Sequence, residues 1–290
     1  MPQPIVANLE KIAQCTWTDD DDPDRRDPTT IEVLIGPNGE LGGETLRRFP
    51  GLRLVICMGT AYDNVDLDYC RKRGIGVSNT AGYAGPSVAE LAIGLMLSVG
   101  RRISEIDQAI QQGATQTTAF IAHDVNGRTA GIFGLGDIGK RVARACDALG
   151  MQVAYTNRSG RRGGIGQWME RAELFAVADV LFLTAPLDAD TEKVINAEAI
   201  ARMKNGAVLI NVSADELVDF PALHQALVDG HLAGAGIDVI GDPTRYAGVP
   251  NLVTTHLNGW WTYECQLRWA DTWAAALSGW IAGERVNPVL

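Results

Sequence analysis

No stretch of about twenty uninterrupted apolar residues occurs in this chain of 290 residues, so we expect no membrane-spanning helix. The sequence also begins without the basic and then apolar order of a secretion signal, which predicts a cytoplasmic protein. Cysteine is scarce and forms no CxxC pair, which argues against a disulfide framework or a zinc site and favours reduced, buried thiols. His123, His224 and His231 lack metal-ligand spacing, so we expect no metal.

Positive charge is also in short supply. The chain has 25 Lys and Arg residues against 35 Asp and Glu residues, and its net charge of −10 would repel a phosphate backbone. Since there is no basic stripe either, we expect a small-molecule substrate and no nucleic-acid partner. The acidic run from Asp19 to Asp22, followed by Pro23 and Asp24, is interpreted as a solvated loop.

The length exceeds the usual size of one domain, which predicts two domains with separate cores. Apolar and amphipathic segments of the first part alternate as in a parallel α/β layer, with strands expected at 31–36, 52–59 and 75–77 and helices at 44–49 and 66–73. A long helix is expected from Ser87 to about Gln111, with Ser87 and Glu90 as a capping box. The polar stretch 111–120 then interrupts the periodicity and is the best linker candidate.

A second α/β series follows this stretch. Its strands are expected at 129–134, 151–156, 179–186, 207–213, 234–240 and 252–258, with helices at 137–149, 167–177 and 221–230. Strands separated by helices in this way predict a doubly wound parallel sheet of the dinucleotide-binding type. The last helix, 263–282, carries Trp269, Trp273 and Trp280 at helical spacing, a pattern that favours packing over a cofactor site.

A glycine-rich turn, GLGDIG at 134–139, follows a strand and opens a helix. Gly134 permits the tight turn, Gly136 lets a pyrophosphate approach the backbone, and Gly139 lets the helix and strand pack closely. The amides of the helix start, at Asp137 and Ile138, favour an anion. This context predicts binding of a nicotinamide dinucleotide.

The next strand ends in Asn157, Arg158 and Ser159 rather than in the acidic residue that usually binds the ribose of NAD. A neutral Asn157 does not repel a 2′-phosphate, and Arg158 and Ser159 can donate to one, assisted by Arg161 or Arg162. We therefore expect NADP(H) to be preferred over NAD(H). The alternative is a basic surface loop beside an indifferent adenosine pocket.

From about Leu54 to Gly259 the chain resembles the D-isomer-specific 2-hydroxyacid dehydrogenases. The matching segments, in order, are GTAYDNVD (59–66), GIGVSNTAGY (74–83), SVAE (87–90), GLGDIG (134–139), APLDADT (185–191), LINVS (209–213), LVD (217–219) and AGIDV (235–239). The resemblance implies two Rossmann-like domains: a discontinuous substrate domain, 1–98 and 263–290, and an inserted nucleotide domain, 99–262. It also implies a homodimer formed through the nucleotide domain and its long helix, although the apolar stretch at 89–97 is equally compatible with the core.

The resemblance further implies residue roles. The cofactor would contact the glycine turn and residues of the later matching segments, namely Ser87, Ala185, Pro186, Thr191, Val212 and Asp238. His256 in TTHLNG would be the acid/base, although Thr255 stands where proline is common. Asp242, before Pro243, would be the carboxylate that pairs with this histidine. On turn chemistry alone, Asp242 is equally well a turn residue.

Part of the substrate apparatus departs from the family. Ala214 stands at the position of the arginine that binds the keto acid, and Asp215 adds negative charge beside it. Ala61 replaces a glycine common in the substrate loop. The remaining substrate-binding candidates are Met58, Gly59, Thr60 and Trp260, where Trp260 and Trp261 either enlarge an apolar site or fasten the last helix.

Three functions remain open. The first is an NADP(H)-dependent reductase that uses His256 on a carbonyl or imine substrate other than a simple 2-keto acid. The second is a 2-keto-acid reductase of the glyoxylate or hydroxypyruvate type, which uses another arginine such as Arg245 or Arg268. The third is a catalytically silent, NADP(H)-binding regulatory protein.

Overall fold

The computed structural model of the protein describes residues 10, 13–14, 27–36, 40–116, 121–160, 164–239 and 241–290. The expected acidic loop at 19–22 and the arginines Arg161 and Arg162 lie outside them. The chain divides into two compact units: unit 1 is Met1–Ala84 with Tyr263–Leu290, and unit 2 is Gly85–Thr262. We expected the first division after residue 98. It falls earlier because the helix that begins at Gly85 packs on a later helix of unit 2, Asp137–Ala148, and on two of its strands, Ala207–Asn211 and Leu232–Val239.

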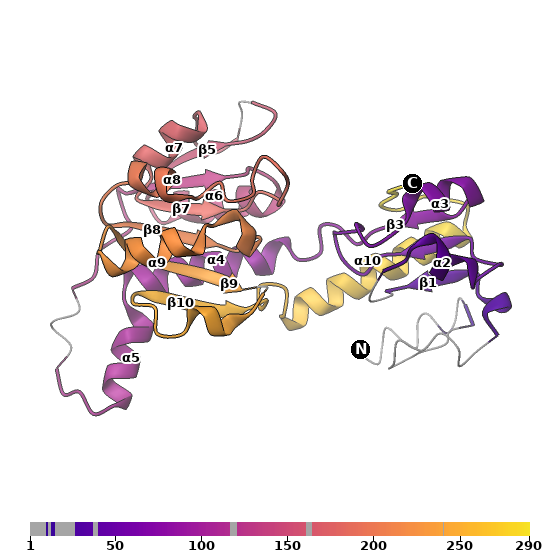
Figure 1. The fold of residues 1–290 in the computed structure, drawn as a ribbon, viewed down its shortest axis with the longest axis horizontal. Coiled ribbons are helices and arrows are strands. Elements are labelled where there is room, and N and C mark those ends of the chain that lie inside the picture. Colours follow the sequence, from indigo (N-terminus) through magenta and orange to yellow (C-terminus); the bar gives the residue numbers. More distant parts are fainter. Residues whose placement is uncertain are drawn as a thin grey trace. The chain divides into compact units, whose positions relative to one another are not determined.

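A seven-stranded parallel sheet forms the centre of unit 2 in the described part of the chain (Figure 1). Its order is β10-β9-β8-β7-β4-β5-β6, so the chain starts at β4 and builds outward in both directions. The strands are β4 (Thr129–Phe133), β5 (Gln152–Thr156), β6 (Gln167–Trp168), β7 (Val180–Leu183), β8 (Ala207–Asn211), β9 (Leu232–Val239) and β10 (Leu252–His256). A reversal of this kind creates a ligand-binding crevice at the carboxyl ends of the strands.

Helices cover both faces of this sheet, as we predicted. In β7, Val180 and Phe182 join one core cluster while Leu181 and Leu183 join the other, because successive side chains of a strand point to opposite faces. The first cluster is closed by α4 (Gly85–Gly100) and α6 (Asp137–Ala148), and the second by α7 (Arg171–Val177), α8 (Ala197–Arg202) and α9 (Phe220–Val228). The apolar stretch at 89–97 on α4 is therefore mostly core of unit 2.

The expected long helix from Ser87 to Gln111 is wrong in two respects. It breaks after Gly100, where the carbonyl of Gly100 accepts from the His123 amide and Arg102 turns left-handed with φ 54° before α5 (Ile103–Gln111). Ser87 is not a cap either, because α4 already begins at Gly85 and the Ser87 hydroxyl bonds the Thr262 hydroxyl at 2.9 Å. The stretch at 111–120, whose residues 117–120 lie outside the described part, does not divide the units.

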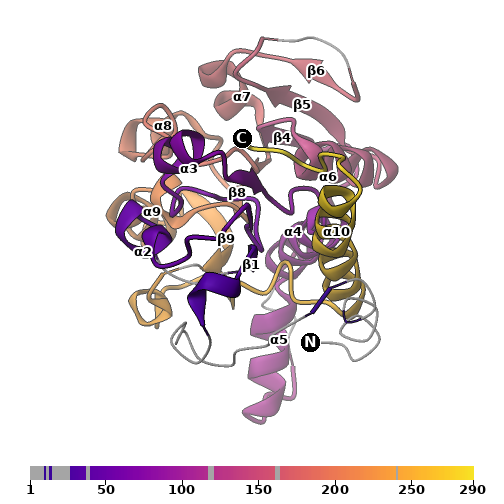
Figure 2. The same ribbon diagram turned by 90° about the vertical axis from the view of Figure 1, so that its right-hand side faces the viewer.

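Two smaller elements also differ from expectation. Residues 167–168, expected to open a helix, pair with β5 as the edge strand β6. Helix α8 was not predicted, although Asn196 caps it by accepting from the Ala199 amide at 3.0 Å. Figure 2 shows β4, β5 and β6 side by side at one end of the sheet.

Unit 1 contains a three-stranded parallel sheet among its described residues, β1 (Val33–Ile35), β2 (Leu54–Ile56) and β3 (Gly76–Ser78). One core cluster packs this sheet against α2 (Gly43–Arg47) and α3 (Leu67–Arg73), and another packs β2 against α10 (Tyr263–Ile281). Trp273 of α10 is fully buried beside Leu54 and Ile56, which confirms the packing role predicted for this tryptophan.

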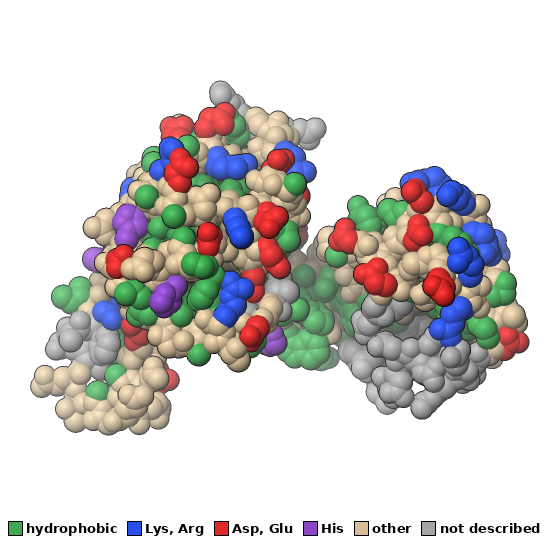
Figure 3. All heavy atoms as spheres, in the orientation of Figure 1, with side chains coloured by type: hydrophobic (Ala, Val, Ile, Leu, Met, Phe, Trp, Pro, Cys, Tyr) green, Lys and Arg blue, Asp and Glu red, His purple; other side chains and the backbone are tan. Residues whose placement is uncertain are grey.

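Figure 3 shows acidic and basic side chains interspersed on the drawn face, without a continuous basic stripe among the described residues there. None of the described helices has the length and apolar character needed to cross a membrane. The four cysteines that the structure describes, Cys57, Cys70, Cys146 and Cys265, are all free and buried, as expected for reduced thiols.

Candidate active site

The predicted nucleotide-binding residues of unit 2 come together at the carboxyl edge of its sheet. Because the strands are parallel, residues that follow them meet at one edge even when they are far apart in sequence. From one end of the sheet to the other, this edge carries Asn157 after β5, Gly134 after β4, Ala185 after β7, Val212 after β8, Asp238 near the end of β9 and His256 at the end of β10. The glycine turn and His256, the candidate acid/base, thus lie along the same edge of the sheet.

Two glycines of the turn are required by the protein itself. Gly134 has φ +105°, and a Cβ there would lie 2.6 Å from the Ala185 amide nitrogen. At Gly139 a Cβ would lie 2.1 Å from the carbonyl oxygen of Gly134. Thr184 closes the same turn by donating its hydroxyl to that carbonyl at 2.7 Å. These contacts bring β4, α6 and the loop after β7 together.

Gly136 is different, because none of the residues that the structure describes requires a glycine there. Its φ is −78°, which any residue adopts, and a Cβ would meet no atom within 4 Å. Gly136 is the N-cap of α6 and supplies no side-chain cap, so the first amides of the helix are free to bind an anion. A pyrophosphate approaching the backbone explains the missing side chain, and the turn fits a dinucleotide.

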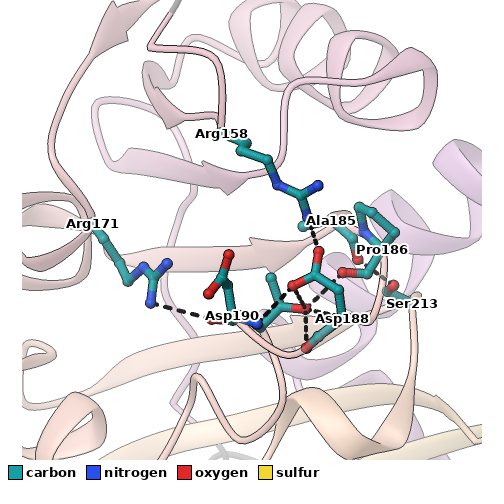
Figure 4. Close-up of polar contacts among 8 residues, drawn as sticks. Arg158, Arg171, Ala185, Pro186, Asp188, Asp190 and Ser213 are labelled. Carbon is teal, nitrogen blue, oxygen red and sulfur yellow. Dashed lines mark hydrogen bonds and ion pairs between the residues drawn. The ribbon is translucent and has the colours of Figure 1, made fainter.

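The loop after β5 lies beside this turn. The Ser159 hydroxyl donates to the Asn157 side-chain oxygen at 3.3 Å. The Arg158 side chain is 71% exposed and forms an ion pair with Asp188, which belongs to the loop after β7 (Figure 4). We did not anticipate Asp188, because nothing in the sequence indicates that positions 158 and 188 meet.

The loop after β7 is held by its own hydrogen bonds. The buried Thr191 donates its hydroxyl to the Pro186 carbonyl at 2.8 Å, and the Ser213 hydroxyl donates to the Ala185 carbonyl at 2.6 Å. The Asp188 side chain accepts from the amides of Asp190 and Thr191 at 2.8 and 3.1 Å. These hydrogen bonds fix the backbone of the loop, and the buried hydroxyl of Thr191 is one of the groups that holds it.

His256 is exposed at the end of the edge strand β10, and a buried carboxylate organises the loop behind it. Asp238, 6% exposed, accepts from the Thr255 hydroxyl at 2.7 Å and from the amides of Asn258 and Gly259 at 2.8 and 2.9 Å. Thr255, which stands where the family commonly has proline, is therefore a hydrogen-bond donor to Asp238. Hydrogen bonds to a carboxylate are about twice as strong as neutral ones.

The Asp242 carboxylate is engaged in a turn. It caps the 3-10 helix η4 (Pro243–Tyr246) by accepting from the Thr244 hydroxyl at 2.7 Å and the Thr244 amide at 2.8 Å. These bonds, the side-chain one first, hold the pKa of Asp242 below its ordinary value. Within the described chain no ion pair joins it to His256, so the geometry fits the turn alternative rather than the pairing.

The segment at the expected arginine position forms a closed turn after β8. The Asn211 amide group donates to the Ala214 carbonyl at 2.8 Å, and the next residue, Asp215, is only 6% exposed. Its carboxylate accepts from the Gly241 amide at 3.1 Å. Burial, followed by the charge of Asp215, raises the pKa of Tyr246 to about 12. The Asp215 carboxylate therefore interacts with groups of the protein itself, the Gly241 amide and Tyr246.

The substrate-loop candidates belong to unit 1, where backbone contacts fix them. The carbonyl of Met58 accepts from the Trp269 indole at 2.9 Å, that of Gly59 from the Thr80 amide at 3.0 Å, and that of Thr60 from the Asn79 side chain at 2.9 Å. Trp260 belongs to unit 2, where its ring packs edge-on against Trp261 with centroids 4.9 Å apart.

A reversal of the strand order between β4 and β7, a glycine turn that fits a pyrophosphate, and an exposed imidazole on the same sheet edge are together typical of a dinucleotide-dependent oxidoreductase. The comparisons with known proteins agree. Residues 93–256 match the family described as D-isomer specific 2-hydroxyacid dehydrogenase, NAD binding domain. The chain belongs to the D-isomer specific 2-hydroxyacid dehydrogenase family and is an NAD(P)-dependent oxidoreductase.

Among its relatives, the chain is 33% identical to a hydroxypyruvate reductase of Thermotoga maritima, over 82% of this chain and 81% of that protein. It is 31% identical to a glycerate dehydrogenase of Methylorubrum extorquens, over 96% and 91% of the two chains. Among solved structures, an acyclic imino acid reductase in complex with NADPH and D-Arg is 25% identical, with a TM-score of 0.89 over 100% of this chain and 96% of that one.

Proposed function

We propose that the protein is a reductase that prefers NADPH and acts on a carbonyl or imine carbon other than that of a simple 2-keto acid, with His256 as the proton donor. The observation that supports this most is the segment after β8. The resemblance expects an arginine at position 214, and this chain has Ala214 followed by the internally bonded acid Asp215. A keto-acid carboxylate would lose two charge-assisted bonds of about 1.5–3 kcal/mol each.

The loop after β5 supports the coenzyme preference. Asn157 brings no negative charge to the ribose end, while Arg158 and Ser159 are exposed donors. The structurally similar imino acid reductase holds NADPH, in agreement with this assignment. We assign the dinucleotide to unit 2 and the candidate substrate loop at Met58 to unit 1.

When bound, the dinucleotide supplies the hydride. His256, in its protonated form, would donate the proton that balances this transfer to the oxygen or nitrogen of the substrate. Asp238 would keep the histidine loop in place through Thr255 and the two amides that follow His256. The exposed position of the imidazole leaves it accessible to a substrate.

Reduction of 2-keto acids is the second candidate, because several relatives are named hydroxypyruvate or glyoxylate reductases. It requires a substitute for the missing arginine. The Arg245 guanidinium lies over the rings of Phe220 and Tyr246, at 4.7 and 5.0 Å from their centroids, and Arg268 donates to the Tyr83 carbonyl at 2.9 Å. Both arginines are engaged, which favours the first candidate.

NADPH oxidation by the purified protein would decide between the two. The substrates to compare are glyoxylate, hydroxypyruvate, simple aldehydes and ketones, and imines formed from keto acids with amines. We expect turnover of an imine or ketone above that of both keto acids, and loss of this turnover in His256→Asn with unchanged NADPH affinity. Efficient reduction of glyoxylate or hydroxypyruvate would refute the substrate assignment, and an active His256→Asn protein would refute the role of the histidine.

We also propose that the protein is a homodimer. Helix α5 contains no buried residue among those described, and Ile103 and Ile110 are 54% and 53% exposed. An amphipathic helix with an uncovered apolar face is typical of an interaction surface.

A further inference from the structure

One ion pair connects the two loops on either side of the glycine turn. Strand β4, which leads into Gly134, lies between β5 and β7 in the sheet. Arg158 follows β5 and Asp188 follows β7, and their side chains meet (Figure 4). In a dinucleotide-binding sheet, the loop after the second strand holds the ribose of the adenosine. The ion pair therefore lies on the loop expected to face the 2′ position of this ribose, where NADP carries a phosphate and NAD a hydroxyl.

The two partners of this ion pair are held differently. Asp188 is fixed, because its side chain accepts from the amides of Asp190 and Thr191 and is only 30% exposed. Arg158 has a 71% exposed side chain, and its long stem allows the guanidinium to turn. When an anion arrives, Arg158 is the partner that moves.

We propose that Asp188 is a specificity-determining residue that competes with the 2′-phosphate of NADP(H) for the Arg158 guanidinium. This inference rests on the proposed preference for NADPH. A phosphate carries up to two negative charges and accepts bidentate hydrogen bonds from arginine, so it displaces the carboxylate. A neutral ribose hydroxyl does not displace it, and NAD(H) binds with the ion pair intact. Asp188 thus lowers the affinity for NADP(H) alone.

The opposite role, in which Asp188 orients Arg158 for the phosphate, is less consistent with the charges. Asp188 and a bound 2′-phosphate are both anions within reach of one guanidinium, so they repel each other. Arg158 also has no need of a support to reach a phosphate, because it extends from the ribose loop itself. The two roles predict opposite changes in NADPH affinity when the Asp188 charge is removed: competition predicts tighter binding, and orientation predicts weaker binding.

Fluorescence titration of the full chain with NADPH and NADH, which differ only in the 2′-phosphate, separates the two roles. Asp188→Asn removes the charge and keeps an amide oxygen for the Asp190 and Thr191 amides. Asp190→Asn is the matched control, because it removes the same charge from the same loop. Among the described residues it is the carbonyl of Asp190, and not its carboxylate, that accepts from an arginine, Arg171, at 3.5 Å. Arg158→Gln tests the arginine itself.

For Asp188→Asn we expect NADPH to bind about two- to fivefold more tightly than to Asp190→Asn, the range of an exposed ion pair, with equal NADH affinities. In an Arg158→Gln background the two aspartate variants should bind NADPH equally. The competition is refuted if Asp188→Asn binds NADPH as Asp190→Asn does, or more weakly. Failure of the NADPH preference has another signature, a wild-type protein that binds NADPH no more tightly than NADH, and the comparison of the aspartate variants stays decisive in that case.

Discussion

Replacing Gly136 with alanine should weaken coenzyme binding and leave the fold intact. At this position φ is −78° and a Cβ would meet no atom of the described residues within 4 Å. A Gly→Ala change stabilises a protein by about 0.4–1 kcal/mol because the unfolded chain loses freedom. Alanine is a poorer N-cap than glycine by a similar amount, so the two effects offset each other and the net change in stability should be small. The added methyl group would occupy the space through which a pyrophosphate reaches the first amides of α6. Loss of one charge-assisted bond, about 1.5–3 kcal/mol, weakens binding about ten- to a hundredfold.

Gly139→Ala is the matched control, because the same added methyl group meets the protein instead. Its Cβ would lie 2.1 Å from the Gly134 carbonyl and 2.9 Å from the Thr184 hydroxyl. Overpacking of this kind costs about 1–3 kcal/mol, so Gly139→Ala should unfold at lower urea concentration than wild type. The two glycines of one motif should thus separate ligand binding from stability.

Urea unfolding followed by circular dichroism gives the stabilities, and NADPH fluorescence gives the affinities. We expect a Gly136→Ala midpoint close to that of wild type, together with the loss of affinity. The reasoning is refuted if Gly136→Ala binds NADPH as wild type does. It is also refuted if Gly136→Ala is as destabilised as Gly139→Ala, since the space beside Gly136 would then belong to the protein and not to a ligand.

Two further predictions concern buried groups. Thr255→Val removes a 2.7 Å hydrogen bond to Asp238 and should lower the turnover that depends on His256 about tenfold, with unchanged NADPH affinity. Thr255→Ser keeps the hydroxyl and should keep the wild-type rate. Equal rates in all three proteins would contradict this role of Thr255. Burial raises the pKa of Cys57 to about 11 and that of Cys146 to about 12, so both thiols should resist Ellman's reagent at pH 8 until urea unfolds the chain. In the unfolded chain these thiols ionise at lower pH than in the folded protein, so ionisation favours the unfolded state. The free energy of unfolding should therefore be highest below about pH 9 and fall as the pH rises toward 12, and the urea midpoint should be lower at pH 10.5 than at pH 8.

Apolar runs were enough to predict most strands of the fold. The segments at 179–186 and 207–213 contain β7 and β8, because strands buried on both faces are continuously apolar. The helix break after Gly100 could not be predicted in this way. The apolar periodicity continues through it, and a left-handed Arg102 is intrinsically unfavourable. Its ion pair with Glu105, three residues on, accompanies this conformation and appears only in the folded chain.

Sequence reasoning located the candidate site but not the contacts that support it. The glycine turn has a local signature, because its spacing and its place between a strand and a helix are both visible in one short segment. The contact of Asp188 with Arg158 joins two loops, and that of Asp238 with Thr255 joins the neighbouring strands β9 and β10, so both contacts depend on the strand order. For Asp242 the local turn chemistry before proline proved the better guide to its contacts, since its carboxylate caps η4.

The acids around the candidate site bear on the choice between the imine and the ketone that we proposed as substrates. Asp215 is committed to the Gly241 amide, and Asp242 to Thr244, so neither carboxylate is directed at His256 by the bonds it forms. A ketone oxygen is weakly basic and depends on a strong, well-placed acid as hydride arrives. An imine nitrogen is far more basic, so a histidine that no carboxylate tunes can still supply its proton. Among the described residues no carboxylate is paired with His256, and this agrees with the imine branch of our proposal.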